Sequence, residues 1–117
     1  MTIYREFAEV LLPKGVLDYF ELIDFNKENN SLSIYLEEKN TIPIEYMDRS
    51  YRLNGYMPEI TITDFPIREY KVKLKIKRRR WLLIDSNTKI SRDWTLLSPG
   101  TRITHEFADF LKELARY

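Results

Sequence analysis

The residues best suited to binding a charged ligand lie in one basic run, which reads Lys71-Val-Lys-Leu-Lys-Ile-Lys-Arg-Arg-Arg-Trp81. Seven of the ten residues from Lys71 to Arg80 are basic. In a β-strand, alternate side chains share one face and lie about 7 Å apart. Because lysine alternates with valine, leucine and isoleucine, the run predicts a row of ammonium groups on one face of a strand and an apolar row on the other.

A row of ammonium groups at this spacing suits a polyanion. Duplex DNA carries one negative charge per about 1.7 Å of its axis, so several phosphates can meet the row at once. The alternative is a solvated strand face whose lysines protect a sheet edge from aggregation. The basic residues that we expect to contact nucleic acid are Lys71, Lys73, Lys75, Lys77, Arg78, Arg79, Arg80, Arg92 and Arg102.

The triple arginine at 78–80 breaks the alternation, so at least one of its side chains should point toward the core. A buried guanidinium needs a partner. Asp64 and Asp93 are candidates for an ion pair, and Trp81 and Trp94 could instead offer a ring face to the cation.

Charge is divided unevenly along the chain. Residues 1–64 carry six Lys/Arg and twelve Asp/Glu, a net charge of −6, and residues 65–117 carry thirteen and six, a net of +7, which together give the +1 of the whole chain. This division favours a C-terminal half that faces a polyanion, because the local field steers such a ligand. The alternative is that the two halves pair with each other.

The residue types required for catalysis are scarce. The one histidine, His105, falls in the first turn of a predicted helix, where a solvent-facing or capping role is expected. No Gly-x-Ser-x-Gly motif occurs, and three glycines cannot build a phosphate-binding loop. The absence of cysteine excludes disulfides and cysteine-based zinc sites. We therefore expect neither catalysis nor a cofactor or metal.

The first half of the chain predicts one helix and one hairpin. Residues 2–12 form an amphipathic pattern with an apolar stripe, and the residues 13–15 that follow contain helix-ending Pro and Gly. Residues 18–26 and 31–39 predict two strands joined by a turn at 27–30. Residues 40–58 are irregular, with a tight-turn signal at Asn54-Gly55. The stripe of the helix consists of Ile3, Phe7, Val10 and Leu11.

The second half predicts further strands and a helix. Strands are expected at 59–65, at 69–83 with a bend near the triple arginine, and at 89–95 after a turn at 85–88. A C-terminal helix follows residues 98–100, capped by Thr101 or Thr104. Its apolar stripe consists of Ile103, Phe107, Phe110, Leu111 and Leu114.

These elements predict an α+β fold, in which a small antiparallel β-sheet of ribbon-like hairpins is flanked by an N-terminal and a C-terminal helix. Residues 1–117 form a single domain, with an acidic helix-and-hairpin part at 1–58 and a basic part at 59–117 that holds ribbon-like hairpins and the last helix. Apolar runs are too short to cross a membrane, and no secretory signal is visible, so a cytoplasmic protein is expected.

Residues 60–117 resemble the N-terminal region of a branch of insertion-sequence transposases. In that branch a zinc ribbon and a helix-turn-helix precede a catalytic domain with an acidic (DDE) triad. The resemblance rests on Asp64-Phe65-Pro66 before the basic strand, on Arg78-Arg79-Arg80-Trp81, and on Gly100-Thr101-Arg102-Ile103-Thr104 at the entry to the helix. The whole chain is also similar to short Bacteroides-type transposase N-terminal regions, which share Thr2 to Leu12 and Glu37 to Pro43 in the same order.

The resemblance implies a non-catalytic DNA-binding module that recognises transposon terminal repeats. Its partners would be DNA, and a separately encoded catalytic subunit or a second copy. This chain departs from the family at the two turns expected to be zinc knuckles, 51–56 and 82–89, which lack cysteine, so zinc should be absent. The alternatives are a protein-interaction module that uses the basic strand and a sheet edge near Leu83 and Ile84, or a decayed transposase remnant.

Overall fold

The computed structural model describes residues 2–95 and 104–117. Helices and strands occur together, which confirms the predicted α+β class. The helices are α1 (Thr2–Leu11), α2 (Val16–Tyr19) and α3 (His105–Ala115), with a 3-10 turn η1 (Ile44–Tyr46). The strands are β1 (Phe20–Glu28), β2 (Ser31–Glu38), β3 (Tyr51–Tyr56), β4 (Ile60–Ile67), β5 (Tyr70–Lys77), β6 (Arg79–Leu83) and β7 (Thr88–Ser91).

The larger sheet has four strands in the order β1-β2-β5-β4. The β1–β2 hairpin was predicted, and Asn29 at its turn has a positive φ of 49°. The prediction of a wholly antiparallel sheet is wrong, because β2 and β5 pair in parallel, from Ser31 opposite Lys71 to Glu37 opposite Lys77. Each hairpin has only one apolar face, and the parallel pairing of their inner strands joins these faces into one that α3 can cover.

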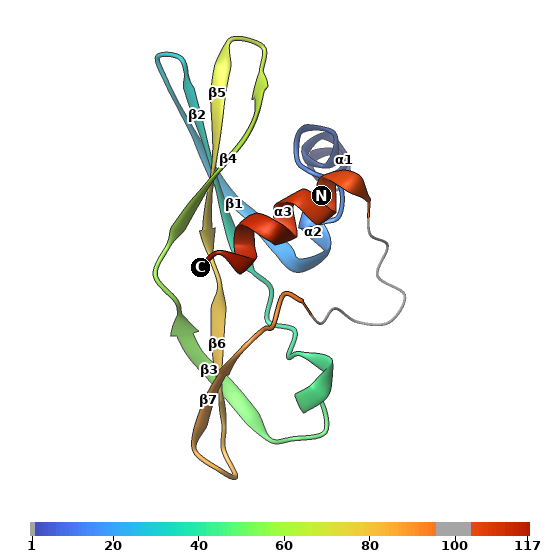
Figure 1. Cartoon of the computed structure of the whole chain (residues 1–117), viewed down its shortest axis with the longest axis vertical. Coiled ribbons are helices and arrows are strands. Elements are labelled where there is room, and N and C mark those ends of the chain that lie inside the picture. The colour runs from blue at the N-terminus through green and yellow to red at the C-terminus, as the bar shows by residue number, and fades with distance from the viewer. Residues whose placement is uncertain (1, 96–103) are drawn as a thin grey trace.

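The second sheet has three antiparallel strands in the order β3-β6-β7. The strand predicted over 69–83 is interrupted near the triple arginine, where a bend was expected: β5 ends at Lys77 and β6 begins at Arg79. The prediction of one continuous strand is wrong, because the chain passes from one sheet to the other at Arg78 (Figure 1). Strand β3 lies in the stretch predicted to be irregular. Its Asn-Gly pair forms no tight turn, because Gly55, with φ of 72°, lies where the register with β6 shifts.

The core lies between the four-stranded sheet and the two later helices. Helix α3 crosses the inner face of the sheet (Figure 1) and buries Phe107, Phe110 and Leu114. Phe20 at the start of β1 stacks on Trp94, with ring centroids 5.2 Å apart. The apolar stripe predicted for this helix is thus confirmed at these positions, while Ile103 lies outside the described residues.

The first turn of α3 is capped as predicted. The Thr104 hydroxyl accepts a hydrogen bond from the Phe107 backbone N–H at 3.1 Å. Thr101, the other capping candidate, lies outside the described residues. Because a capped N-terminus satisfies an otherwise free donor, Thr104 fixes where this helix begins.

The apolar stripe predicted for α1 does not face the core at Phe7 and Val10, and the side chain of Ile3 lies outside the described part of the chain. Phe7 and Val10 are 64% and 81% exposed, and the helix packs through Ala8 and the following Leu12 instead. On this same face, the Arg5 guanidinium donates a hydrogen bond to the Leu17 carbonyl at 3.2 Å. The short helix α2, which the sequence did not predict, thus contacts α1 through this hydrogen bond.

Candidate nucleic-acid interface

The four lysines of the basic run share one face of β5, as predicted. Val72, Leu74 and Ile76 between them are each 0% exposed on the core side. Lys71 and Lys73 are exposed, and the two that follow are half-buried. The face of β5 that carries Lys71, Lys73, Lys75 and Lys77 is called the lysine face below.

The lysine face runs along the middle of a sheet. Strand β5 lies between β2 and β4, so both of its backbone edges are hydrogen-bonded. The interpretation that these lysines protect a sheet edge is therefore wrong, because β5 has no free edge. Strand β6 is likewise the middle strand of its sheet.

Hydroxyl side chains flank the lysine face on both sides. Ser33 of β2 and Thr63 of β4 are both register partners of Lys73. Lys75 donates a hydrogen bond to the Thr61 hydroxyl at 3.1 Å. Hydroxyl groups can contact phosphate oxygens directly. The sequence did not indicate these residues, because alternation shows which face a side chain occupies but not which strand lies beside it.

The lysine face shares its side of the sheet with carboxylates: Glu37 is the register partner of Lys77, and Glu21, Asp24 and Glu28 of β1 lie beyond β2 on the same side. Within residues 2–95 and 104–117, no ion pair involves any of the four lysines. Lys77 lies over the Tyr56 ring, 5.9 Å from its centroid. The Tyr56 hydroxyl donates to the Glu37 carboxylate at 2.9 Å, and burial, reinforced by this bond, raises the pKa of Tyr56. Glu37 and the acidic side chains of β1 therefore border the lysine face on its β2 side.

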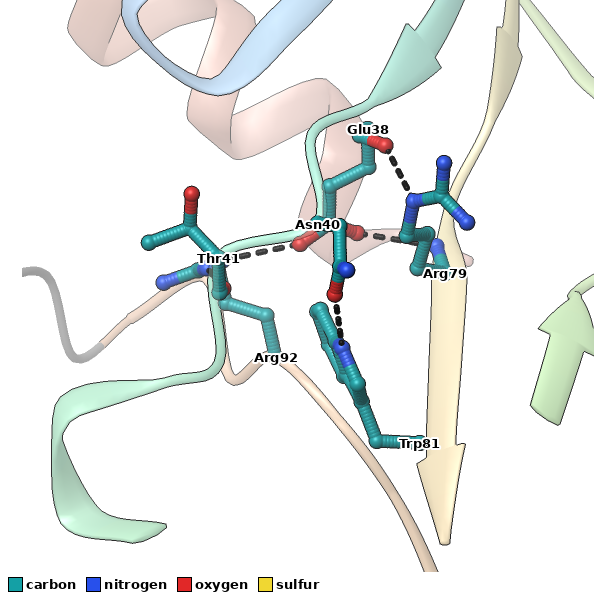
Figure 2. Close-up of polar contacts among 6 residues, drawn as sticks. All are labelled: Glu38, Asn40, Thr41, Arg79, Trp81 and Arg92. Carbon is teal, nitrogen blue, oxygen red and sulfur yellow. Dashed lines mark hydrogen bonds and ion pairs between the residues drawn. The ribbon is translucent and has the colours of Figure 1, made fainter. Parts of the chain in front are cut away.

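Arg92, in contrast, is part of the interior (Figure 2). Its Nε donates to a Glu38 carboxylate oxygen at 2.8 Å, and the two side chains are 4% and 0% exposed. The guanidinium also donates to the Thr41 carbonyl and lies 5.3 Å from the Tyr19 ring centroid and 5.6 Å from that of Trp94. Its donors therefore point into the protein and away from any phosphate outside it.

Glu38 accepts further hydrogen bonds where the two sheets meet. Its second carboxylate oxygen accepts from the Arg79 backbone N–H at 3.0 Å, and its carbonyl accepts from Arg79 Nε at 2.7 Å (Figure 2). Beside it, Trp81 Nε1 donates to Asn40 at 3.1 Å. Burial raises the pKa of Glu38, and the hydrogen bonds from Arg92 and Arg79 oppose that rise.

The partners predicted for an inward-pointing arginine of 78–80 are not found there. No ion pair joins these arginines to Asp64 or Asp93 among the described residues, and Asp93 accepts from the Thr95 hydroxyl at 2.6 Å. Arg92, for which no such partner was predicted, pairs with Glu38 and lies over the rings of Trp81 and Trp94. A carboxylate 54 residues away along the chain cannot be paired with it from local pattern.

The triple arginine does send a side chain inward, as predicted. Arg78 is 7% exposed, and it donates to the Tyr117 carbonyl at 3.3 Å. Its Nε and that of the half-buried Arg80 are buried without a hydrogen-bond partner among the described residues. Burial lowers the pKa of Arg78. The structure thus brings the four lysines together and separates them from Arg78 and Arg92, while Arg102 lies outside the described residues.

Features that point to other functions are few in the described part of the chain. His105 is exposed in the first turn of α3, in agreement with a solvent-facing role. No group of three or more His, Asp or Glu residues there could hold a metal ion. None of the described helices is both long and apolar enough to cross a membrane.

Comparison with known proteins adds no relative, since no protein-family model, curated protein or solved structure matches this chain. The support for a function therefore comes from the geometry of the lysine face and from the sequence resemblance.

Proposed function

We propose that this chain is a non-catalytic DNA-binding module of the insertion-sequence transposase type, acting in the cytoplasm. The lysine face would contact the phosphate backbone at the terminal repeats of the element. The observation that carries the proposal is the row of four lysines on a middle strand, with no ion pair to an acidic side chain among the described residues. The assignment to the transposase class is based on the sequence resemblance alone.

Electrostatics favours a polyanion on this face. Two ammonium groups about 7 Å apart in water repel each other by about 0.6 kcal/mol. The row contains three such neighbouring pairs, Lys71–Lys73, Lys73–Lys75 and Lys75–Lys77, and a bound phosphate backbone would relieve all of them.

The size of the lysine face fits part of one duplex. From Lys71 to Lys77 the strand advances six residues, or about 20 Å. The serine and threonine hydroxyls beside the row add neutral donors along the same length. Phosphate contacts position a protein without reading sequence. Preference for the terminal repeat would therefore need base-edge contacts from other residues, with Arg102 a candidate.

The decisive test is fluorescence anisotropy of labelled duplex DNA, using the terminal repeat and a scrambled duplex over a range of salt. We expect affinity to fall steeply with salt. In the Lys73→Ala, Lys75→Ala, Lys77→Ala triple variant, the slope of log affinity against log salt should decrease by about 2.7 for either duplex, because each phosphate contact contributes about 0.9. Unchanged affinity and slope in this variant would contradict the lysine face as the interface.

The matched control removes the same charge elsewhere. A Lys14→Ala, Lys39→Ala, Lys89→Ala triple variant lowers the net charge equally but alters no residue of the lysine face. It should keep the slope of the wild type. An equal loss in both variants would mean that net charge alone, and no particular face, drives association.

The protein-interaction alternative predicts a different outcome. Neither β5 nor β6 has a free edge, so edge-to-edge pairing through Leu83 would require the three-stranded sheet to open. The acidic part of a second copy could still meet the lysine face. Light scattering separates the two readings: a monomer at all concentrations argues against self-association, and binding to a separately encoded catalytic subunit would be measured with that subunit.

A further inference from the structure

A groove opens on the other face of the four-stranded sheet, between β4 and α3. Its volume is about 400 Å³. Ile62 and Leu74 from the sheet and Phe110 from the helix line its apolar floor. Phe65 lies at the groove with 78% of its surface exposed. The exposed Phe65 continues the apolar surface of the groove floor outward, and an apolar concave surface with a few polar groups is the usual form of a binding site.

Carboxylates surround this apolar floor. Four acidic residues line the groove, and one lysine, Lys112, gives a net of −3. Glu113 has a partner in Arg116, at 3.2 Å on the exposed side of α3. The other three carboxylates form no ion pair with any described residue. The acidic residues are Asp64, Glu106, Asp109 and Glu113.

Asp64 lies close enough to Glu106 to be influenced by its charge. Asp64 is half-buried, and burial raises its pKa, with the charge of Glu106 adding to the rise. A cation placed beside both carboxylates would favour the ionised form of Asp64. The groove therefore combines an apolar floor that is open to solvent with carboxylates at its rim that have no cationic partner among the described residues.

We propose that this acidic groove binds a basic amphipathic segment of a partner protein. The apolar side chains of that segment would cover Phe65 and the floor, and its Lys or Arg side chains would meet Asp64, Glu106 and Asp109. Helix α3, with eleven residues, is about 16 Å long. This wall length suits about three turns of a helix laid alongside it.

A second copy of this chain is a poorer occupant. Its basic surface within the described residues is the lysine face, where the neighbours of the lysines are hydroxyl side chains such as Ser33 and Thr63. That surface supplies positive charge without the apolar half that the floor requires. The occupant is therefore a different protein, whose binding segment has apolar side chains on one side and Lys or Arg side chains on the other.

The groove and the lysine face lie on opposite sides of one sheet. Thr63 and Asp64 are consecutive on β4 and are the register partners of Lys73 and Val72, so their side chains point to opposite faces of the sheet, although both residues line the groove. Both faces can thus be occupied at the same time. The groove proposal does not depend on DNA binding, and either one can fail alone.

The experiment uses the full chain and a labelled leucine–lysine amphipathic helical peptide of about 15 residues, roughly 22 Å long. Binding is measured by fluorescence anisotropy, with a leucine–glutamate peptide of the same pattern as control. We expect the basic peptide to bind and the acidic one not to bind. Asp109→Lys and Phe65→Ser should each weaken binding at least about fivefold, because one removes a favourable charge and the other an apolar contact.

Two further variants keep the result interpretable. Glu45→Lys reverses an exposed charge outside the groove and should leave the affinity unchanged. The lysine-face triple variant should also bind the peptide as the wild type does. Circular dichroism checks that Phe65→Ser and Asp109→Lys remain folded.

Several outcomes would overturn the proposal. An equal loss in Glu45→Lys would mean non-specific attraction to acidic surface, and an unchanged affinity in Phe65→Ser would remove the apolar floor from the interface. A dimer in light scattering that Asp109→Lys abolishes would make a second copy the occupant. Full displacement of the peptide by duplex DNA would contradict separate faces.

Discussion

Replacement of Arg92 by methionine tests the assignment of this residue to the interior. Methionine has a similar length, so packing against the Tyr19, Trp81 and Trp94 rings is largely kept. The guanidinium is lost, and with it the ion pair to Glu38 at 2.8 Å. The carboxylate of Glu38, which is 0% exposed, then remains in the core without its charged partner.

The expected cost is large for a single substitution. Removing one partner of a buried ion pair costs about 3–5 kcal/mol, because the remaining charge is left uncompensated. Loss of the hydrogen bond to the Thr41 carbonyl would lower the free energy of unfolding by about 1 kcal/mol more. Contacts between the methionine sulfur and the aromatic rings would stabilise the variant by about the same amount. We therefore expect the free energy of unfolding to fall by about 4 kcal/mol at neutral pH, out of the 5–15 kcal/mol that is usual for a domain.

The loss should depend on pH in a defined direction. Burial raises the pKa of Glu38 above its ordinary value of 4.5, and removal of Arg92 takes away the strongest opposing interaction. Between the unfolded and the folded pKa, the folded state binds more protons than the unfolded state, so stability falls as pH rises through this window. The destabilisation by Arg92→Met should thus be larger at about pH 8 than at about pH 5.

Urea denaturation followed by tryptophan fluorescence measures this effect. With a slope of about 2 kcal/mol/M, the midpoint should shift by about 2 M. Arg49→Met is the matched control, because Arg49 pairs with Asp85 at 2.9 Å on the surface, where ion pairs contribute little. The double variant Arg92→Met, Glu38→Gln should lose most of the added pH dependence.

Two results would refute this reasoning. One is a destabilisation by Arg92→Met no larger than that of Arg49→Met, and the other is a loss that does not grow with pH. If Arg92→Met instead stayed fully stable and weakened DNA binding, the arginine would belong to the interface and not to the core.

Three smaller predictions concern the backbone, and each is measured by urea denaturation. Gly15→Ala should cost more than about 2 kcal/mol, because φ is 98° and the new methyl would lie 3.0 Å from the Phe107 ring. Gly55→Ala, with φ of 72° but its nearest atom 3.8 Å away, should cost only about 1 kcal/mol; equal costs at the two glycines would contradict the contact with Phe107. Thr104→Ala should cost about 1 kcal/mol, whereas Thr104→Ser should retain most of the stability because serine also caps, and an equal loss in both would count against the hydrogen bond to Phe107.

Local pattern alone determined several parts of this protein. The alternation of lysine with aliphatic residues predicted both faces of β5, and the turn at residues 27–30 predicted the β1–β2 hairpin. The spacing of Phe107, Phe110 and Leu114 predicted the buried face of α3. These features depend on residues close together in the chain, whose periodicity matches the repeat of a strand or a helix.

Only the tertiary structure decided where those elements lie. The same alternation suits an edge strand and a middle strand equally well, and the parallel pairing of β2 with β5 is what places the lysine face at the centre of a sheet. The apolar stripe of α1 suggested a buried face, but Ala8 and the following Leu12 are the buried positions, and the half-exposed Arg5 donates to the Leu17 carbonyl of α2. The groove beside Phe65 exists only because α3 packs beside β4.

The arginines show the physical reason for this division. The sequence could predict that an arginine near 78–80 must turn inward, since the alternation fails there. It could not predict that Arg92 would be buried against Glu38, because the free energy of a buried charge depends on desolvation and on partners brought from distant parts of the chain. Periodicity in the sequence determines which side chains share a face, and only the packing of the elements determines which residues contact that face.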